Sequence, residues 1–153
     1  MFVFILHDIY SNVKLGEFID VVLAFRLVDL VVISKASSAA AQTGVPEAEK
    51  KAFMKNQRIL YLPDLSDIKE LLGLSKLYLI VPNKLSEEKL DFDRLREEIN
   101  KERIGVAISG GDSSFTAREL QLGIPVNIGV NDILPPSAYA GIILYNLSTY
   151  QNT

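Results

Sequence analysis

The alternation of short apolar runs with segments of helical period constrains this chain more than any other feature. Runs rich in Val, Ile, Leu and Phe predict buried strands at residues 2–6, 30–34, 59–62, 77–81, 106–109 and 124–126. The segments between them predict helices at 15–26, 47–57, 65–72, 87–101, 115–121 and 137–147. Parallel strands need long crossovers, usually helical, so this order predicts an α/β fold: a mostly parallel sheet with helices on both faces.

Composition supports one domain over residues 1–153. The chain is 48% hydrophobic and 23% charged, and nothing in it marks a linker. A chain of about 150 residues buries roughly two thirds of its unfolded surface, so one core is sufficient. The lack of cysteine excludes disulfides, and with a single histidine a zinc site would consist almost wholly of carboxylates. The sequence therefore excludes a structural zinc site, and we assign no metal-binding residue from it.

The apolar segments at the start of the chain do not predict export or a membrane span. Residues 1–6 are apolar, but no basic region precedes them. Residues 21–33 are the most apolar stretch, yet they carry Arg26 and Asp29 and fall short of the ~20 residues that cross a bilayer. We expect a cytoplasmic protein without a membrane span.

Small residues, helix-capping residues and prolines predict where several helices begin. The small residues of 35–45 predict a mobile loop or a frayed helix start. Ser86 and Glu87 supply a cap and an acid for a helix beginning at 87, and Pro135 and Pro136 fit the entry to the last helix.

The segment 109–114, Ser-Gly-Gly-Asp-Ser-Ser, allows two interpretations. It is similar to the ATP pyrophosphatase loop, but one residue is missing and the segment follows the fifth predicted strand rather than the first. The simpler interpretation is a strand-to-helix turn in which glycines supply positive φ and Ser or Asp caps the next helix. In either case, a Gly-rich turn at the carboxyl end of a parallel strand is a candidate ligand site.

A nuclease-like pattern is also present. Pro63-Asp64 followed by Glu87-Glu88-Lys89 fits the PD-(D/E)xK pattern. Magnesium-dependent cleavage needs the acid and the lysine together on a strand, with carboxylates converging on one ion. The helical period around Glu88 and Lys89 instead predicts a solvated helix, so the pattern does not predict a nuclease.

His7 and Asp8 stand at the carboxyl end of the first predicted strand. Such a histidine can act as a general base, because its unperturbed pKa lies near neutrality. The ordinary alternative, which we favour, is a partly buried histidine bonded to a neighbour.

The densest basic cluster offers a possible phosphate-binding surface. Helical spacing would place Lys51, Lys55 and Arg58 on one face, with Lys50 beside them and Lys35 upstream. The net charge of −3 means that any nucleic-acid surface is local, and an ordinary charged helix face is an equal alternative.

Taken in order, these segments resemble the SPOUT superfamily of RNA methyltransferases, specifically its SpoU/TrmH branch, over nearly the whole chain. The first motif is carried by residues 11–19 and 24–25, and the second by the strand and Gly-rich loop of 106–112. The third is the most specific and is carried by Ile124, Pro125, Gly129, Ile133, Leu134 and the helix of 137–145.

The resemblance implies an α/β parallel-sheet fold with a C-terminal trefoil knot, bound S-adenosylmethionine, a homodimer and an RNA substrate such as tRNA or rRNA. Apolar surface on more than one face of the first and last predicted helices also suits a dimer. By the same resemblance, the cofactor-binding residues are Ser109, Gly110, Ile124, Ile128, Gly129, Ile133 and Leu134.

The candidate catalytic residues implied by the resemblance are Asn12, Asp20 and Ser137. Asp20 stands where the branch has an arginine that helps to activate the ribose hydroxyl. His7, Asp20 and Arg26 are then candidates for the base. The resemblance thus implies an S-adenosylmethionine-dependent RNA methyltransferase, and the alternative is a knotted RNA-binding or cofactor-binding module without catalysis.

Overall fold

The computed structural model describes residues 1–149 and has one six-stranded sheet in the order β3-β2-β1-β5-β4-β6. Every neighbouring pair of strands is parallel, which confirms the predicted α/β class. The strands are β1 (Phe2–Ile9), β2 (Leu30–Ala36), β3 (Ile59–Leu62), β4 (Lys76–Ile80), β5 (Ile104–Ser109) and β6 (Ile124–Val126).

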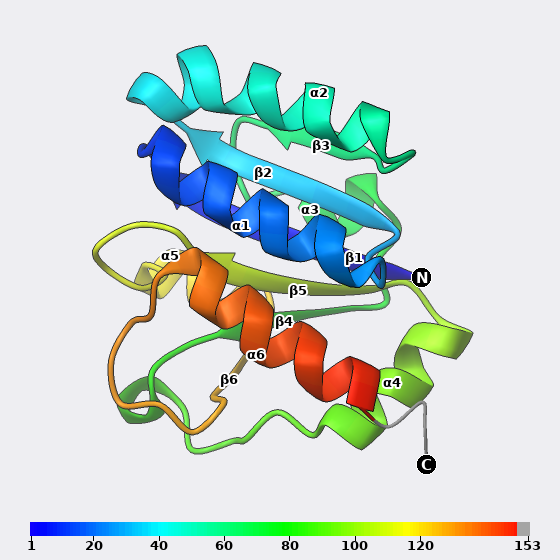
Figure 1. Cartoon of the computed structure of the whole chain (residues 1–153). Helices are drawn as coiled ribbons and strands as arrows, with labels where there is room; N and C mark the ends of the chain where they lie inside the picture. The colour runs from blue at the N-terminus through cyan, green and yellow to red at the C-terminus, as the bar shows by residue number, and fades with distance from the viewer. Residues whose placement is uncertain (150–153) are drawn as a thin grey trace.

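Helices cover both faces of the sheet, as predicted. Figure 1 shows α1, α2 and α6 on the face toward the viewer and α3 and α5 behind it. The α-helices are α1 (Asn12–Phe25), α2 (Val45–Met54), α3 (Ile68–Leu71), α4 (Phe92–Lys101), α5 (Ala117–Leu120) and α6 (Pro136–Thr149). No described helix is both long and apolar enough to traverse a bilayer.

Two cores form because side chains alternate along each strand. In β1, Phe2 and Phe4 contribute to the core beneath α1 and α6, whereas Val3 and Ile5 contribute to the core that contains Ile68 of α3. The strands are therefore apolar on both faces, as expected of a sheet covered on both sides.

The predicted helix of 87–101 is wrong in its first turn, because α4 begins only at Phe92. Asp91 caps this helix by accepting from the Arg94 amide at 3.1 Å, whereas Ser86 donates its hydroxyl to the Pro125 carbonyl. Residues 88–90 instead run beside the end of β6: the Leu90 amide donates to the Asn127 carbonyl, and the Asn127 amide donates to the Glu88 carbonyl.

The small-residue segment is not a simple loop. After β2, residues Ala40–Gly44 form one π-helical turn (η1) that leads directly into α2. Gly44 packs closely against α1 there, because a Cβ would lie 2.9 Å from the end of the Leu15 side chain. A close helix contact, which sequence period does not encode, therefore orders the segment.

The predicted basic face does not form as one helical row. Helix α2 ends at Met54, so Lys55 and Arg58 lie beyond it. Lys51 forms an ion pair with Asp20 of α1 at 3.0 Å. The early end follows from the turn at Asn56, whose φ of 56° lies outside the helical region.

Candidate functional site

The loops that follow β4, β5 and β6 enclose a cavity at the carboxyl edge of the sheet. The cavity measures about 520 Å³ and is lined by Pro82, Lys84, Leu85, Asp112, Ser113, Ser114, Asp132 and Ile133. A smaller hollow of about 190 Å³ shares Asp112 and Ile133, and it adds Lys14, Gly110, Gly111, Leu134, Pro135 and Pro136. We call the two together the loop pocket. Ligands of parallel α/β sheets bind at this edge.

The glycines of the loop pocket allow a close approach to the end of β1. A Cβ on Gly110 would lie 2.9 Å from the Leu6 side chain and 3.2 Å from the Asp8 carbonyl oxygen, and the Gly110 amide donates to the His7 carbonyl at 2.7 Å. Neither Gly110 nor Gly111 has a positive φ, so the predicted reason for these glycines is wrong.

The predicted capping residue of the next helix is also wrong. Thr116, and not the Ser or Asp of 109–114, accepts from the Glu119 amide and caps α5. The segment is nevertheless a strand-to-helix turn, in agreement with the simpler interpretation.

Polar atoms in the loop pocket are available to a ligand. Ser114 lines the pocket, and its buried Oγ has no hydrogen-bond partner among the described residues. The same is true of Asn83 Oδ1, which lies in the loop after β4 but does not line the pocket. Such atoms are rare in proteins and are satisfied by a ligand or water in many sites. Asp112 accepts from the Tyr10 hydroxyl at 2.7 Å, and this hydrogen bond raises the pKa of Tyr10.

The predicted cofactor residues fall into two groups. Gly110, Ile133 and Leu134 line the loop pocket. Ser109 lies just beneath it, and its hydroxyl donates to the Ser113 carbonyl at 2.8 Å, which shapes the loop.

The other three do not line the loop pocket. Ile124 pairs with Tyr78 inside the sheet, and Ile128 packs against the core. Gly129 is exposed, with a φ of 88° that favours glycine, and its amide donates to Asn127 Oδ1.

The three predicted catalytic residues are not brought together. Asn12 is the first residue of α1, two positions before Lys14 of the loop pocket, and Ser137 follows Pro136 in the first turn of α6. Asp20 lies eight residues further along α1, about 12 Å at 1.5 Å per residue. It is exposed, pairs with Lys51 and does not line the pocket.

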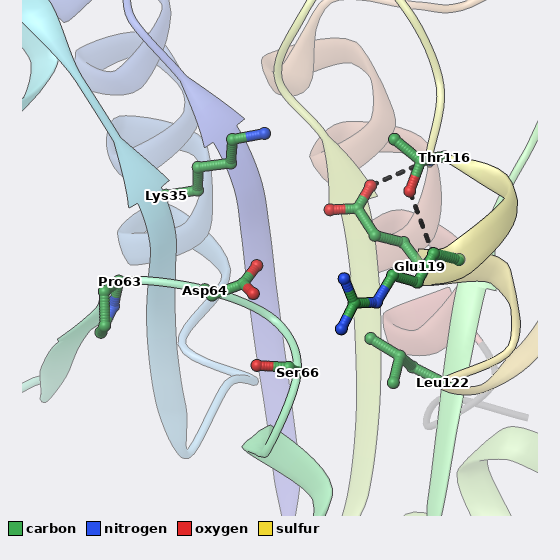
Figure 2. A pocket seen from close by; sticks show the side chains of 8 residues that line it. Lys35, Pro63, Asp64, Ser66, Thr116, Glu119 and Leu122 are labelled. Carbon is green, nitrogen blue, oxygen red and sulfur yellow. Dashed lines mark hydrogen bonds between the residues drawn. The ribbon is translucent and has the colours of Figure 1, made fainter.

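A second hollow, which we call the His7 cleft, lies at the same edge beyond β1. It measures about 560 Å³ and is lined by Lys35, Pro63, Asp64, Ser66, Thr116, Arg118, Glu119 and Leu122. Figure 2 shows Asp64 and Glu119 facing each other from opposite walls, the first from the loop after β3 and the second from α5.

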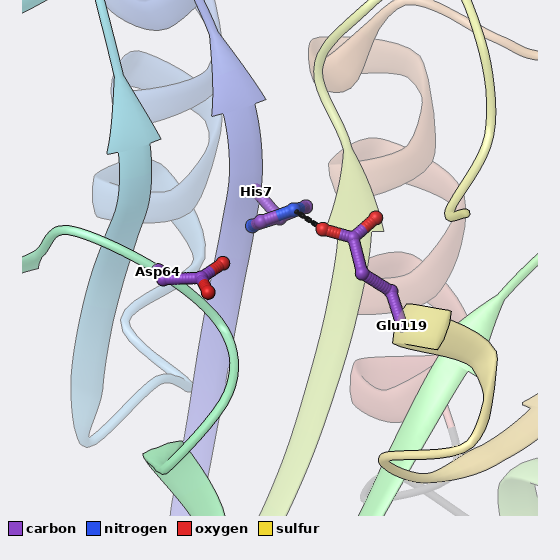
Figure 3. A group of neighbouring side chains, drawn as sticks. All are labelled: His7, Asp64 and Glu119. Carbon is purple, nitrogen blue, oxygen red and sulfur yellow. Dashed lines mark hydrogen bonds and ion pairs between the residues drawn. The ribbon is translucent and has the colours of Figure 1, made fainter. Parts of the chain in front are cut away.

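His7 lies between these two carboxylates (Figure 3). Its side chain is 1% exposed, and its Nδ1 lies 2.8 Å from the Ser34 Oγ of β2. Its Nε2 lies 2.5 Å from Glu119 Oε2, and its ring stacks on Phe115. The interpretation of a buried histidine bonded to neighbours is therefore confirmed.

Glu119 is held in its ionised form. Burial alone would raise its pKa, but hydrogen bonds from Thr116 and the interaction with His7 outweigh burial and lower it. One of its oxygens accepts from the Thr116 amide at 2.9 Å, and the other faces His7. The carboxylate therefore keeps its charge on its wall of the cleft.

Asp64 and Glu119 are the functional candidates that sequence reasoning missed as partners of His7. A Thr-x-x-Glu capping box was visible at Thr116 and Glu119, but it indicated a helix start and not a site. The nuclease-like pattern is not assembled: Asp64 follows β3 at one edge of the sheet, whereas Lys89 pairs beside β6 at the other.

Comparison with solved structures defines the class of fold. The chain resembles a probable methylase family protein from Haemophilus influenzae, with a TM-score of 0.72, 15% identity, and coverage of 99% of this chain and 66% of that one. It resembles TrmJ from Z. mobilis with a TM-score of 0.71, 13% identity, and coverage of 100% and 71%. It resembles the SpoU methyltransferase AviRb from Streptomyces viridochromogenes, solved with AdoMet, with a TM-score of 0.69, 13% identity, and coverage of 98% of this chain and 60% of that one. The chain therefore shares the α/β fold of these methyltransferase structures, a six-stranded parallel sheet flanked by helices.

The sequence itself belongs to a family with a different description. Residues 38–146 match the family described as RecB-family nuclease (DUF2122), and the chain belongs to this family. It is 32% identical to a Methanocaldococcus jannaschii protein provisionally named type II restriction enzyme MjaORF1200P, over 94% of this chain and 93% of that protein. A relative from Aeropyrum pernix, provisionally named type II restriction enzyme ApeKORF2002P, is 31% identical over 94% and 90%.

Proposed function

We propose that the protein is an S-adenosylmethionine-dependent methyltransferase that acts on RNA. The observation that carries the proposal is the loop pocket, which lies at the carboxyl ends of β4, β5 and β6 and is lined by Ser114, whose buried hydroxyl has no partner among the described residues. The SPOUT-like fold supports it, as does the AdoMet complex of a protein with that fold.

The residues of the loop pocket fit the proposed cofactor. Leu85 and Ile133 offer apolar surface to an adenine ring, and Ser114 offers its hydroxyl to the edge of the ring or to the ribose. Asp112, oriented by Tyr10, offers a negative charge to the amino group or the sulfonium. When bound, the cofactor supplies an activated methyl group.

The chain would then align a nucleophile and remove a proton. Asn12 and Ser137 begin the two helices next to the smaller part of the pocket, so they are the proposed catalytic residues. Asp20 lies outside the lining, and its proposed role depends on a homodimer that brings it to substrate. The trefoil knot, the SpoU/TrmH branch and the homodimer belong to the same proposal.

The provisional names of the relatives motivate a second candidate, phosphodiester cleavage by a nuclease. The His7 cleft is the observation that favours it, because it combines a histidine with two carboxylates. The nuclease-like pattern of Asp64 and Lys89 gives it no support, since these residues belong to opposite edges of the sheet.

Calorimetric titration with S-adenosylmethionine tests the main proposal. We expect the full chain to bind it, Ser114→Tyr to lose binding at least tenfold by filling the pocket, and Ser66→Tyr, which fills the His7 cleft instead, to bind as the parent does. Circular dichroism checks that both variants fold. No binding by the folded parent would contradict the cofactor site.

Activity assays then separate the candidates. Transfer of radiolabelled methyl groups to bulk RNA, lost in Asn12→Ala or Ser137→Ala, supports methyl transfer. Binding of the cofactor without transfer supports the non-catalytic module. Cleavage of RNA or plasmid DNA with Mg²⁺ or Mn²⁺, with no methyl transfer, would favour the nuclease.

A further inference from the structure

We propose that His7, Asp64 and Glu119 bind a divalent cation in the His7 cleft, and that the cation and the basic residues of the cleft together bind a phosphate group. One ligand atom from each of the three side chains lies within 4.8 Å of the other two. They come from β1, the loop after β3 and α5, so only the folded sheet assembles them. This inference does not depend on methyl transfer.

The orientation of His7 is that of a metal-binding histidine. Ser34 Oγ, itself fully buried, lies 2.8 Å from Nδ1 and fixes the ring, and stacking on Phe115 restricts it further. Histidines that bind metals commonly have such a fixed partner on the ring nitrogen that does not bind the metal. The other nitrogen, Nε2, faces Glu119 and the cleft.

Asp64 and Glu119 differ in exposure, and the exposed Asp64 marks the side from which a cation could enter. Glu119 is mostly buried and fixed by Thr116, whereas Asp64 is exposed and uses one oxygen to accept from the Leu65 amide at 2.7 Å. A cation would replace the short Nε2 to Oε2 contact and recruit the second oxygen of Asp64. The loop after β3 thus closes the site over ligands supplied by β1 and α5.

The basic residues of the cleft suit an anion beside the cation. Lys35 and Arg118 line the same hollow as the two carboxylates. Neither forms a salt bridge with any residue of the described chain. Two cationic side chains next to a carboxylate-bound metal ion match a phosphate group, which shares its oxygens between metal and guanidinium.

The ligand set indicates the type of cation. One imidazole and two carboxylates suit Mn²⁺ better than Mg²⁺, because Mg²⁺ prefers oxygen ligands alone. The set has no thiolate, and it has one histidine where catalytic zinc sites often have two or three. We therefore choose Mn²⁺ as the probe.

The test is a titration of the full chain with Mn²⁺, in which the electron paramagnetic resonance signal of free Mn²⁺ reports how much of the ion is unbound. We expect one bound ion per chain, at least tenfold weaker binding in Asp64→Asn, and unchanged binding in Asp67→Asn, an exposed neighbour in the same loop that does not line the cleft. Asp64 is exposed, so its substitution should leave the fold intact, whereas His7→Gln could unfold the chain.

A second titration tests the phosphate group. Inorganic phosphate should bind only in the presence of Mn²⁺, and Arg118→Gln should weaken phosphate binding severalfold while leaving Mn²⁺ binding unchanged. No Mn²⁺ binding at millimolar concentration, or equal binding by Asp64→Asn and the parent, would overturn the metal site. Phosphate binding that ignores Mn²⁺ would overturn the joint site. Binding of S-adenosylmethionine, measured separately, bears only on the loop pocket.

Discussion

The loop pocket and the His7 cleft open on the same edge of one sheet but are built differently. The loop pocket is formed by backbone turns, with glycine and proline in its walls and with a buried Ser114 hydroxyl that has no partner among the described residues. The His7 cleft is formed by ionisable side chains that already bond to one another. The loop pocket can receive a ligand without losing an internal hydrogen bond, whereas a ligand in the His7 cleft must replace the contact between His7 and Glu119.

The largest expected effect comes from removing the histidine. His7→Ala leaves the buried Ser34 hydroxyl without its partner and removes the His7 contact of the Glu119 carboxylate, which keeps only its bond from the Thr116 amide. This should lower the free energy of unfolding by about 3 kcal/mol. Urea denaturation measures this, with the exposed Ser66→Ala as control. An unchanged free energy of unfolding would mean that the His7 network does not form in solution.

Ligands of the loop pocket and of the His7 cleft should stabilise the folded protein independently of each other. Each ligand at about 100 times its Kd should add about 2.7 kcal/mol to the free energy of unfolding. S-adenosylmethionine and Mn²⁺ should add their effects, because the two hollows share no lining residue. Thermal unfolding with each ligand and with both checks this, and Asp64→Asn should lose the Mn²⁺ shift alone. Loss of both shifts would show that the two regions are not separate sites.

Replacing glycine by alanine should have opposite effects on stability at Gly110, in the tightly packed wall of the loop pocket, and at Gly16, where the added methyl group has open space. Gly110→Ala should cost about 1–3 kcal/mol, because its Cβ would meet the Leu6 side chain and the Asp8 carbonyl. Gly16→Ala, in α1 with no atom near the added Cβ, should instead stabilise the protein by up to ~1 kcal/mol. Thermal unfolding of the pair measures the contrast, and equal effects would contradict the packing at Gly110.

The smallest expected effect is on the titration of Tyr10. Because the hydrogen bond to Asp112 raises the pKa of Tyr10 in the folded protein, that bond stabilises the fold below the normal tyrosine pKa and is lost as the pH rises through the raised value. Asp112→Asn should lower this pKa toward the normal value. Ultraviolet titration of the tyrosines measures the change, and Asp132→Asn, which has no bond to Tyr10, should leave the curve unchanged.

The strands were predictable because each is apolar on both faces and short. The predictions for β3 and β6 match the structure at both ends, and β1 differs only in extending to Ile9. The polar His7 and Asp8 hid that extension, since a strand that ends in a site carries residues that break its apolar pattern.

The candidate sites were only half predictable. Gly110 and Ile133 were found through a family resemblance, and the structure places both in the loop pocket. Asp64 and Glu119 were not assigned to His7, because they lie far from it in the chain and meet it only through the order of the strands. The start of α4 was misplaced for a similar reason, since the pairing of residues 88–90 with Asn127, just after β6, overrides their helical period.

The sequence by itself determined the class of fold, because hydrophobic period and crossover length are local properties of the chain. It also placed a glycine turn after β5 and a histidine at the end of β1, each at the edge where ligands bind. Only the tertiary structure decided which loops face each other across that edge. Strand order is fixed by packing between segments distant in sequence, and it is this order that surrounds His7 with two carboxylates and separates Asp64 from Lys89.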